Sequence, residues 1–335
     1  MAYYKRGQGW TVARRRHHGS GSMSSFIAAG TAYASMAGTI PVLRLLLMFG
    51  FQRIGDLVWA ACDMRAKGFM IGGTAGRNDA ERRRFAASRW TQLAQRHRFP
   101  QVRAYDPVFH YETATTIFDG LRRLYQEGET AIYYITVENE NYVMPAMPEG
   151  AEEGIVKGMY KFSSREAPGS KLRVQLFGSG AILRSALDAQ EMLAERYKVS
   201  SDVWSVTSYT QLRREAQECR RWNMLHPDQP PRQSYLEKTL AGVEGPFISA
   251  SDYVQALGEQ LTPWIPGDYY VLGTDGMGRS ETREALRRHF EVDAESITIA
   301  TLHRLHAQGK LDASVVAQAI KDLDYDPEKV NPLYA

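Results

Sequence analysis

One stretch of the sequence restricts the possible fold class more than any other. KLRVQLFGSGAILRSALDAQEMLAERY, at 171–197, passes from an apolar strand through a Gly-Ser-Gly turn into an amphipathic helix. A second strand, DVWSVTS at 202–208, and a helix at 210–225 follow directly, while TAIYYITV at 130–137 predicts another buried strand. Strands and helices that alternate in this way are typical of a mainly parallel α/β sheet.

The sequence predicts two helix starts near its C-terminal end and one domain boundary in its middle. Asp293 can cap a helix that stops at Gly309, and Asp312 can cap another that runs to Leu323. The polar segment SREAPGS, at 164–170, contains Pro and Gly and is the best candidate for a domain boundary. Since 335 residues suffice for roughly two domains, we expect one domain over 1–165 and a second over 166–335.

Positive charge is concentrated near the start. Residues 1–103 hold 17 Lys and Arg against 4 Asp and Glu, whereas the rest of the chain holds 24 against 34. Arg77 to Phe99 alone carries seven arginines without a helical or strand period. Such asymmetry normally indicates a nucleic-acid or membrane partner, and an arginine-rich start without acids also imitates an organellar transit peptide. The apolar stretch at 26–51 is interrupted by Pro41 and Arg44, so we expect no membrane span there.

The glycine-rich strings carry only weak site signals when taken singly. GGTAG at 72–76 and FGSGA at 177–181 lack the Lys-Ser/Thr of a phosphate-binding P-loop and do not match GxGxxG, so structural turns are the favoured interpretation. LGTDGMGRS at 272–280 can face either a ligand or a partner subunit. His226 stands alone, and a lone histidine is more often a hydrogen-bonding residue than a catalytic base.

Cysteine use indicates the redox compartment. Cys62 and Cys219 are far apart and form no CxxC pattern, so neither a disulfide framework nor a zinc site is predicted. A reducing cytoplasm fits this composition best.

Six strings, taken together and in order, resemble one family. They are MFGFQRIGDL (48–57), GFMIGGTAGR (68–77), NENYVMPAMPEGAEEGI (139–155), RWNMLHP (221–227), VLGTDGMGRS (271–280) and RRHFEVDAESI (287–297). The chain resembles the homodimeric pyruvate dehydrogenase of bacteria, the thiamine-diphosphate-dependent decarboxylating component of the pyruvate dehydrogenase complex. The resemblance runs to the final VNPLYA, but it covers less than half of a family member's length.

The resemblance implies an architecture and an activity. It implies a transketolase-like α/β fold, with an incomplete pyrimidine-binding domain over 1–165 and a transketolase C-terminal-like domain over 166–335. The cofactor would be thiamine diphosphate, with Mg²⁺ held by an N-terminal domain that precedes these two in the family. The reaction would be oxidative decarboxylation of pyruvate, with acetyl transfer to the lipoyl group of the dihydrolipoamide acetyltransferase component. Family members are homodimers, and we expect a cytoplasmic protein without a nucleic-acid or membrane partner.

Three windows depart from the family in a regular way. After GGTAGR the family has a loop resembling TTLNGEGLQHQDGHS, which is absent here. Codons can be chosen for Asn78 to Gln92 that give TTLNGEGLQHQDGH when read from the second base. The same displacement recovers FYVYY from 42–47 and EGITEA from 15–21. Ten of the 17 early positive charges lie in or beside these windows, so the basic region is interpreted as displaced codons rather than as a nucleic-acid interface. They are Arg14, Arg15, Arg16, Arg44, Arg82, Arg83, Arg84, Arg89, Arg96 and Arg98.

The displaced windows remove the family's catalytic residues from this portion of the chain. The glutamate that hydrogen-bonds the aminopyrimidine would fall across Gly19 and Ser20, and a family tyrosine across Leu46 and Leu47. The loop glutamate and its first histidine would fall at two further paired positions, Arg83/Arg84 and Ala87/Ser88. We therefore predict no catalytic residue and no metal ligand.

Two residues remain as predicted cofactor contacts. Met48 and Phe49 lie where the family packs an aromatic side chain against the aminopyrimidine, although a Met-Phe pair before a helix is also ordinary core. Two hypotheses follow: a pyruvate dehydrogenase by descent, or a catalytically silent fragment with only a structural or association role. Because displaced arginines would be buried without partners, we also expect residues 1–100 to be poorly ordered or prone to aggregate, and residues 171–335 to fold alone.

Overall fold

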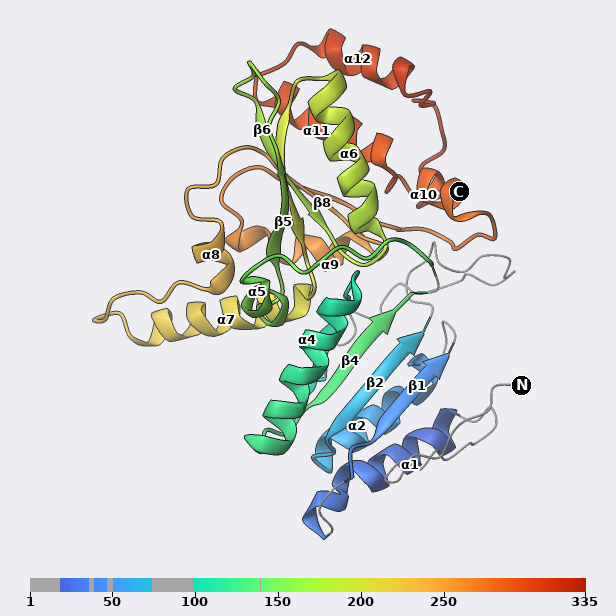
Figure 1. The fold of residues 1–335 in the computed structure, drawn as a ribbon, viewed down its shortest axis with the longest axis vertical. Coiled ribbons are helices and arrows are strands. Elements are labelled where there is room, and N and C mark those ends of the chain that lie inside the picture. The colour runs from blue at the N-terminus through green and yellow to red at the C-terminus, as the bar shows by residue number, and fades with distance from the viewer. Residues whose placement is uncertain (1–18, 36–38, 47–50, 74–98, 139) are drawn as a thin grey trace.

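The computed structural model describes residues 19–35, 39–46, 51–73, 99–138 and 140–335, and these form two α/β units (Figure 1). The first unit contains a four-stranded parallel sheet with the strand order β1-β2-β4-β3. Its elements are α1 (Gly19–Thr31), β1 (Val42–Leu46), α2 (Gly55–Asp63), β2 (Gly68–Gly73), β3 (Val102–Tyr105), α4 (His110–Leu121), which continues as a π-helical turn at Arg122–Gln126, and β4 (Ile132–Val137).

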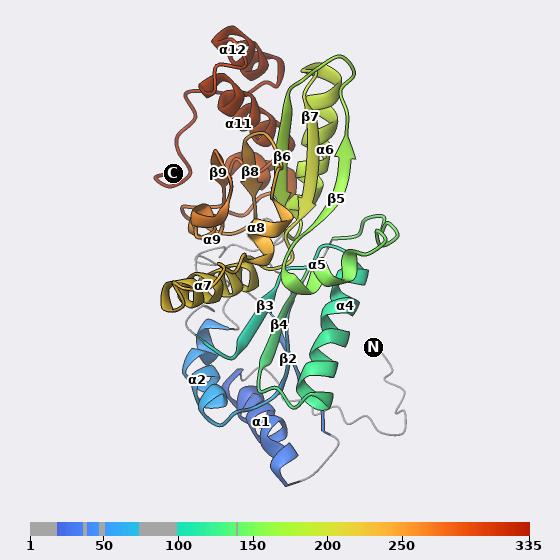
Figure 2. The ribbon, with the colours of Figure 1, turned by 90° about the vertical axis from the view of Figure 1, so that its left-hand side faces the viewer.

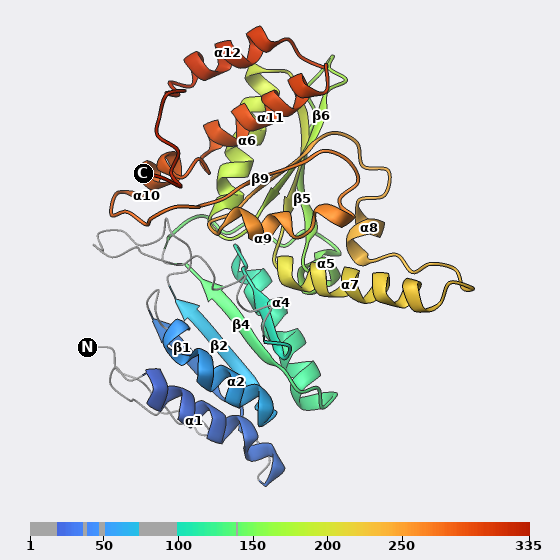
Figure 3. The same cartoon turned by 180° about the vertical axis from the view of Figure 1, so that it is seen from behind.

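Helices cover both faces of the first sheet. Helices α1 and α2 lie against one face (Figure 3). Met23, Val58 and Met70 are fully buried in a common core there. Helix α4 covers the other face, and the Phe69 ring lies so close to Gly120 that a Cβ there would come within 2.6 Å of it. The apolar faces of α1, β1, α2 and β2 therefore find partners in a core, and the expectation that residues 1–100 are poorly ordered or prone to aggregate stays a prediction.

The second unit contains five strands in the order β5-β7-β6-β8-β9. All neighbours are parallel except β5 and β7, which are antiparallel. Its elements are α5 (Ala151–Lys157), β5 (Tyr160–Arg165), β6 (Arg173–Gly178), α6 (Ile182–Arg196), β7 (Ser200–Ser205), α7 (Tyr209–Leu225), α8 (Tyr235–Thr239), β8 (Phe247–Ala250), α9 (Gln255–Glu259), β9 (Tyr269–Leu272), α10 (Arg283–His289), α11 (Ala294–Ala307) and α12 (Ala313–Asp322).

The second sheet is the middle layer of three. Val174, Leu176 and Ile248 point to the face covered by α6 and α11. Phe177 and Phe247 point to the opposite face, which is covered by α7, α8 and α9. Helix α7 also lies against β3 of the first unit, so it joins the two units (Figure 2).

Most of the predicted elements are confirmed. The strand and helix at 171–197 are β6 and α6, the strand at 202–208 is β7, and TAIYYITV contains β4. Asp293 caps α11 by accepting a hydrogen bond from the Ser296 amide at 2.9 Å, whereas the side chain of Asp312, the residue before α12, makes no such bond. The expected division at residue 165 falls at the end of β5, a strand that pairs with β7 in the second sheet. In the part of the chain that the structure describes, no helix is long and apolar enough to cross a membrane.

Candidate active site at the seam of the two sheets

The carboxyl ends of strands from both sheets meet at one place, which we call the seam. In Figure 1 the arrowheads of β1, β2 and β4 point toward the second unit. Asp106 follows β3, and its carboxylate accepts hydrogen bonds from Thr136 on β4 at 2.5 Å and from Ser179, just after β6, at 3.0 Å. The Tyr253 hydroxyl, which follows β8, donates to the same carboxylate at 2.9 Å. Ligands of open α/β sheets bind at the carboxyl ends of the strands, so the seam is the candidate site.

A glycine lets the two units approach at the seam. Gly180 has φ +50°, and a Cβ on it would lie 2.6 Å from Asp106 Oδ2 and 2.9 Å from Glu138 Oε1. Only glycine tolerates this combination of backbone conformation and contact. FGSGA is therefore a tight turn that packs against a buried carboxylate, as the structural interpretation of this string expected.

A second buried carboxylate, Glu112, ties α4 to the second unit. Its Oε1 accepts from the hydroxyls of Tyr160 and Ser205, each at 2.7 Å, and its Oε2 accepts from the amides of Val108 and Phe109 at 2.5 and 3.0 Å. The side chain is fully buried. Burial raises the pKa of Glu112 above the ordinary value for glutamate, although the four hydrogen bonds to its oxygens oppose that shift.

A third acid, Glu140, links the segment that follows β4 to α6 and α10. Glu140 pairs with Arg184 of α6 at 2.7 Å and with Arg287 of α10 at 2.8 Å, and the Arg184 guanidinium lies 4.8 Å from the centre of the Tyr142 ring. Burial raises the pKa of Glu140, but the two guanidiniums outweigh it and hold that pKa below its usual range. Three seam carboxylates are thus committed to protein partners rather than offered to a ligand.

The predicted cofactor contacts, Met48 and Phe49, lie outside the described residues. So do Leu47 and the four positions where the loop glutamate and histidine were expected, Arg83, Arg84, Ala87 and Ser88. Gly19 and Ser20, where the family glutamate was expected, begin α1 and carry no carboxylate. Among the residues that the structure describes, no group of three or more His, Cys, Asp or Glu side chains could hold a metal ion.

Two other sequence candidates have structural roles. In the 272–280 loop, Asp275 accepts from the Gln255 amide at 2.9 Å, and Gly276 lies against the Pro332 carbonyl, so this loop contacts the chain's own C-terminal segment. His226 stacks on Trp222 with ring centres 4.4 Å apart, and its Nδ1 lies 2.9 Å from the Trp222 carbonyl oxygen. His226 is therefore a hydrogen-bonding residue, as expected for a lone histidine.

Neither Asp106 nor Glu112 is predicted from the sequence as a site residue, although both lie in the short string RAYDPVFHYET. Their partners are far away in sequence: Tyr253 is 147 residues from Asp106, and Ser205 is 93 residues from Glu112. The only local signal was an acid at the end of a strand and another in the first turn of a helix.

Comparison with known proteins matches both units. Residues 1–145 match the model of the pyruvate dehydrogenase E1 component middle domain, and residues 158–293 match that of the transketolase-like C-terminal domain. The chain is 46% identical to the pyruvate dehydrogenase E1 component of Escherichia coli K12, over all of this chain and 38% of that protein. It is 45% identical to the same component of Pseudomonas aeruginosa, over 99% of this chain and 38% of that protein. The chain thus spans little more than a third of the length of these curated relatives.

Solved structures show the same fold at low identity. Transketolase from Campylobacter jejuni superposes with a TM-score of 0.59 and 16% identity, over 83% of this chain and 38% of that one. A split-gene transketolase, in an inactive β4 tetramer, superposes with a TM-score of 0.60 and 14% identity, over 86% of this chain and 82% of that one. These superpositions confirm the expected transketolase-like α/β fold. Over essentially all of its length, the chain is homologous to a C-terminal part of the pyruvate dehydrogenase E1 component, and it matches the models of that component's middle domain and of the transketolase-like C-terminal domain in this order.

Proposed function

We propose that this chain derives from an enzyme that decarboxylates pyruvate oxidatively with thiamine diphosphate and transfers the acetyl group to a lipoyl group of an acyltransferase component. The observation that carries this proposal is the match at 40–46% identity along essentially the whole chain to pyruvate dehydrogenase E1 components. On this proposal, the first unit is part of an aminopyrimidine-binding domain, and the Mg²⁺ ligands belong to another domain of the enzyme.

The described residues do not supply the carboxylate that activation of thiamine diphosphate requires. Thiamine diphosphate supplies the carbon nucleophile in this family, and the protein must orient it and place a carboxylate beside its pyrimidine ring. Of the two residues at the expected place, Gly19 has no side chain and Ser20 carries an exposed hydroxyl, so neither supplies that carboxylate; a Cβ built at Gly19 would lie 3.3 Å from the Ile54 side chain. Asp106 and Glu112 are held by hydroxyl and amide donors and are not available for that role. We therefore derive no catalytic step for this chain.

A catalytically silent chain that keeps its fold is accordingly the second part of the proposal. The split-gene transketolase chain offers a parallel, because a chain of comparable extent forms a tetramer that is described as inactive. We propose that this chain too can associate with itself or with a lipoyl-bearing acetyltransferase component. We place it in the cytoplasm, where reducing conditions agree with its two free cysteines.

The test is an assay of CO₂ release. The full chain is mixed with thiamine diphosphate, Mg²⁺ and pyruvate, alone and with the separately produced N-terminal portion of the Escherichia coli relative. We expect no release above the protein-free background in either mixture, because the added portion does not supply the carboxylate that Gly19 and Ser20 lack. The matched control replaces this chain by the corresponding fragment of the Escherichia coli protein. If this chain supports turnover in either mixture, the silent interpretation is wrong.

A further inference from the structure

The C-terminal end of α7 exposes apolar and basic side chains together. Met224 is 71% exposed and Leu225 is 51% exposed. Arg220 and Arg221 are exposed one turn earlier, and within the described ranges neither of them makes an ion pair. In Figure 1 this end of the helix projects from the body of the second unit. We call these four residues the α7 tip.

The turn that follows α7 holds the tip in place. The Asn223 side chain accepts a hydrogen bond from the Arg232 amide at 2.7 Å and donates one to the Arg232 carbonyl at 2.9 Å. The Trp222 ring stacks on His226, and the Arg232 guanidinium lies 3.9 Å from the centre of the Trp222 ring. A surface that is ordered before it binds loses little conformational entropy on binding. The tip is therefore suited to docking without rearrangement.

An open groove between α4 and α5 also exposes an apolar side chain. The two helices lie side by side (Figure 2), and the groove between them has a volume of about 500 Å³. Phe118 and Val156 form the apolar part of its lining. Phe118 is 70% exposed, although its ring is large enough to contribute substantially to an interface. We call this feature the α4–α5 groove.

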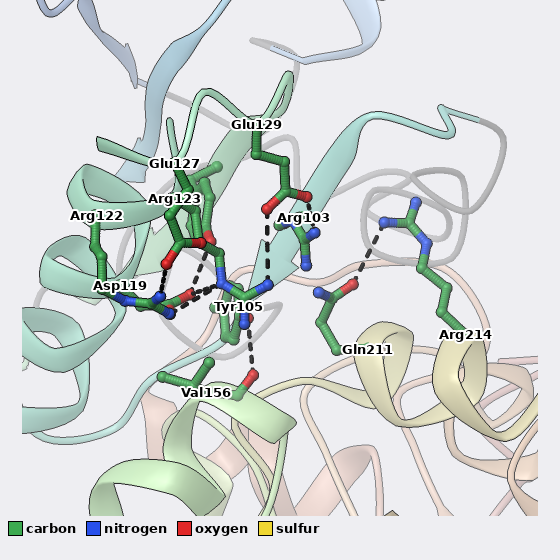
Figure 4. Close-up of polar contacts among 11 residues, drawn as sticks. Arg103, Tyr105, Asp119, Arg122, Arg123, Glu127, Glu129, Val156, Gln211 and Arg214 are labelled. Carbon is green, nitrogen blue, oxygen red and sulfur yellow. Dashed lines mark hydrogen bonds and ion pairs between the residues drawn. The ribbon is translucent and has the colours of Figure 1, made fainter. Parts of the chain in front are cut away.

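The charges of the groove complement those of the tip. The cations of the groove are already paired with acids of the same copy, and Figure 4 shows Arg122 and Arg123 directed at Asp119. The acids Glu152 and Glu153 also line the groove, but they are exposed and pair with no cation in the described part of the chain. The groove therefore offers unpaired acids beside an apolar ring, whereas the tip offers unpaired arginines beside apolar side chains.

On a single copy these two surfaces are separate. Lys157, at one edge of the groove, lies 3.5 Å from Glu215 of α7. Met224 follows Glu215 by nine residues on the same helix, so the tip lies about 14 Å further along α7. None of the four tip residues lines the groove. The groove that the tip can occupy is consequently that of another copy.

We propose that copies of this chain dock with the α7 tip of one in the α4–α5 groove of another. Met224 and Leu225 then cover Phe118, and the arginines of the tip face Glu152 and Glu153. Because the two surfaces differ, the contact either closes a ring of copies or extends as a chain of them. This inference rests on the part of the proposed function in which the chain associates with itself, and it names the surfaces that meet.

The test is sedimentation velocity of the full chain over a series of concentrations. We expect the wild type to associate, and Met224→Glu and Phe118→Glu should each raise the dissociation constant about tenfold or more, since each places a charge in an apolar contact. Both side chains are exposed, so neither substitution disturbs the core. Met64→Glu is the matched control, because Met64 is an exposed methionine at the end of α2 and belongs to neither surface.

A mixture of variants tests whether these two surfaces meet each other. Met224→Glu keeps an intact groove and Phe118→Glu keeps an intact tip, so an equimolar mixture should form heterodimers at concentrations where each variant alone stays monomeric. Association in the mixture also shows that both variants are folded. The charges give a second test, because Arg221→Glu and Glu152→Lys should each weaken association, and the chain that carries both should recover it.

The outcomes separate this inference from the proposed function. If the wild type associates and neither Met224→Glu nor Phe118→Glu weakens association more than Met64→Glu does, these surfaces are wrong and the proposed self-association stands. The same holds if both variants weaken association but their mixture stays monomeric. If the wild type is monomeric at every concentration, the inference and the proposed self-association both fail, while the CO₂ assay still decides the catalytic part of the proposal.

Discussion

Replacing Glu112 by alanine should destabilise the chain strongly, because this carboxylate is the acceptor for four donors in a fully buried site. Without it, the amides of Val108 and Phe109 lose their acceptor, as do the hydroxyls of Tyr160 and Ser205. The hydroxyls can rotate toward other oxygens, and Tyr160 already has Tyr111 at 2.8 Å, so we count only the two amides. At about 1–3 kcal/mol for each buried unsatisfied donor, the free energy of unfolding should fall by about 4 kcal/mol.

Glutamine at the same position should be much less harmful. Its oxygen can accept from the two amides, and its amino group can donate to the oxygens of Tyr160 and Ser205, so we expect a loss of about 1 kcal/mol near pH 5. The pH dependence has a definite sign. Because the folded-state pKa of Glu112 is raised, the folded state holds its proton to a higher pH than the unfolded state does. The stability that this group contributes is therefore complete below its unfolded pKa, and it falls as the pH rises toward the folded pKa.

The assay is urea unfolding followed by tryptophan fluorescence from pH 4.5 to 7.5, with midpoints and slopes compared among wild type, Glu112→Ala and Glu112→Gln. Glu153→Gln, a substitution at an exposed acid on α5, is the control for lost surface charge. The difference between wild type and Glu112→Gln should shrink as the pH rises, because glutamine mimics the protonated acid. The reasoning is refuted if alanine lowers stability by less than about 1 kcal/mol, or if the wild-type and glutamine curves stay parallel across this range.

Two further predictions concern a glycine and a helix cap. Gly180→Ala should lower the free energy of unfolding by about 3 kcal/mol, since it combines a positive φ with a Cβ 2.6 Å from Asp106. Gly128 also has a positive φ, +78°, but the space around it is open, so Gly128→Ala should lower the free energy of unfolding by only about 1 kcal/mol in the same urea assay. Equal losses in these two variants would show that the seam contact is unimportant. Asp293→Ala should cost about 1 kcal/mol through loss of the α11 cap, while Asp312→Ala should change stability by less than about 0.5 kcal/mol because it makes no cap bond. Thermal midpoints measure this pair, and a larger effect at Asp312 would contradict the assignment.

The elements could be predicted from sequence because their signals are local. The run at 171–197 contains the strand period, the turn glycines and the helix period within 27 residues, and it folds as β6 and α6. The family could be inferred for a similar reason, since each of its six strings is continuous. The seam could not be predicted, because Asp106 and Glu112 acquire their environment from residues that only the folded chain brings near. The expected domain boundary at residue 165 stays a prediction: it rests on the polar, Pro- and Gly-containing segment that follows β5, and β5 itself pairs with β7 in the second sheet.

The strand β1 bears on the hypothesis that three windows of the chain are displaced codons, because such a displacement can keep a fold while it removes catalytic residues. Val42–Leu46 lies in one of the three windows, yet it forms a parallel strand with β2 over five residue pairs. The alternation explains this: Leu43 and Leu45 are buried toward α1 and α2, and Arg44 is exposed toward the opposite face. A strand needs only apolar side chains at every second position, and many sequences satisfy that condition. A catalytic carboxylate needs one residue type at one position, so a random replacement almost always loses it. The packed core of the first unit is therefore compatible with the absence of a carboxylate at Gly19 and Ser20, and a measurement of stability alone would not reveal whether the chain is active.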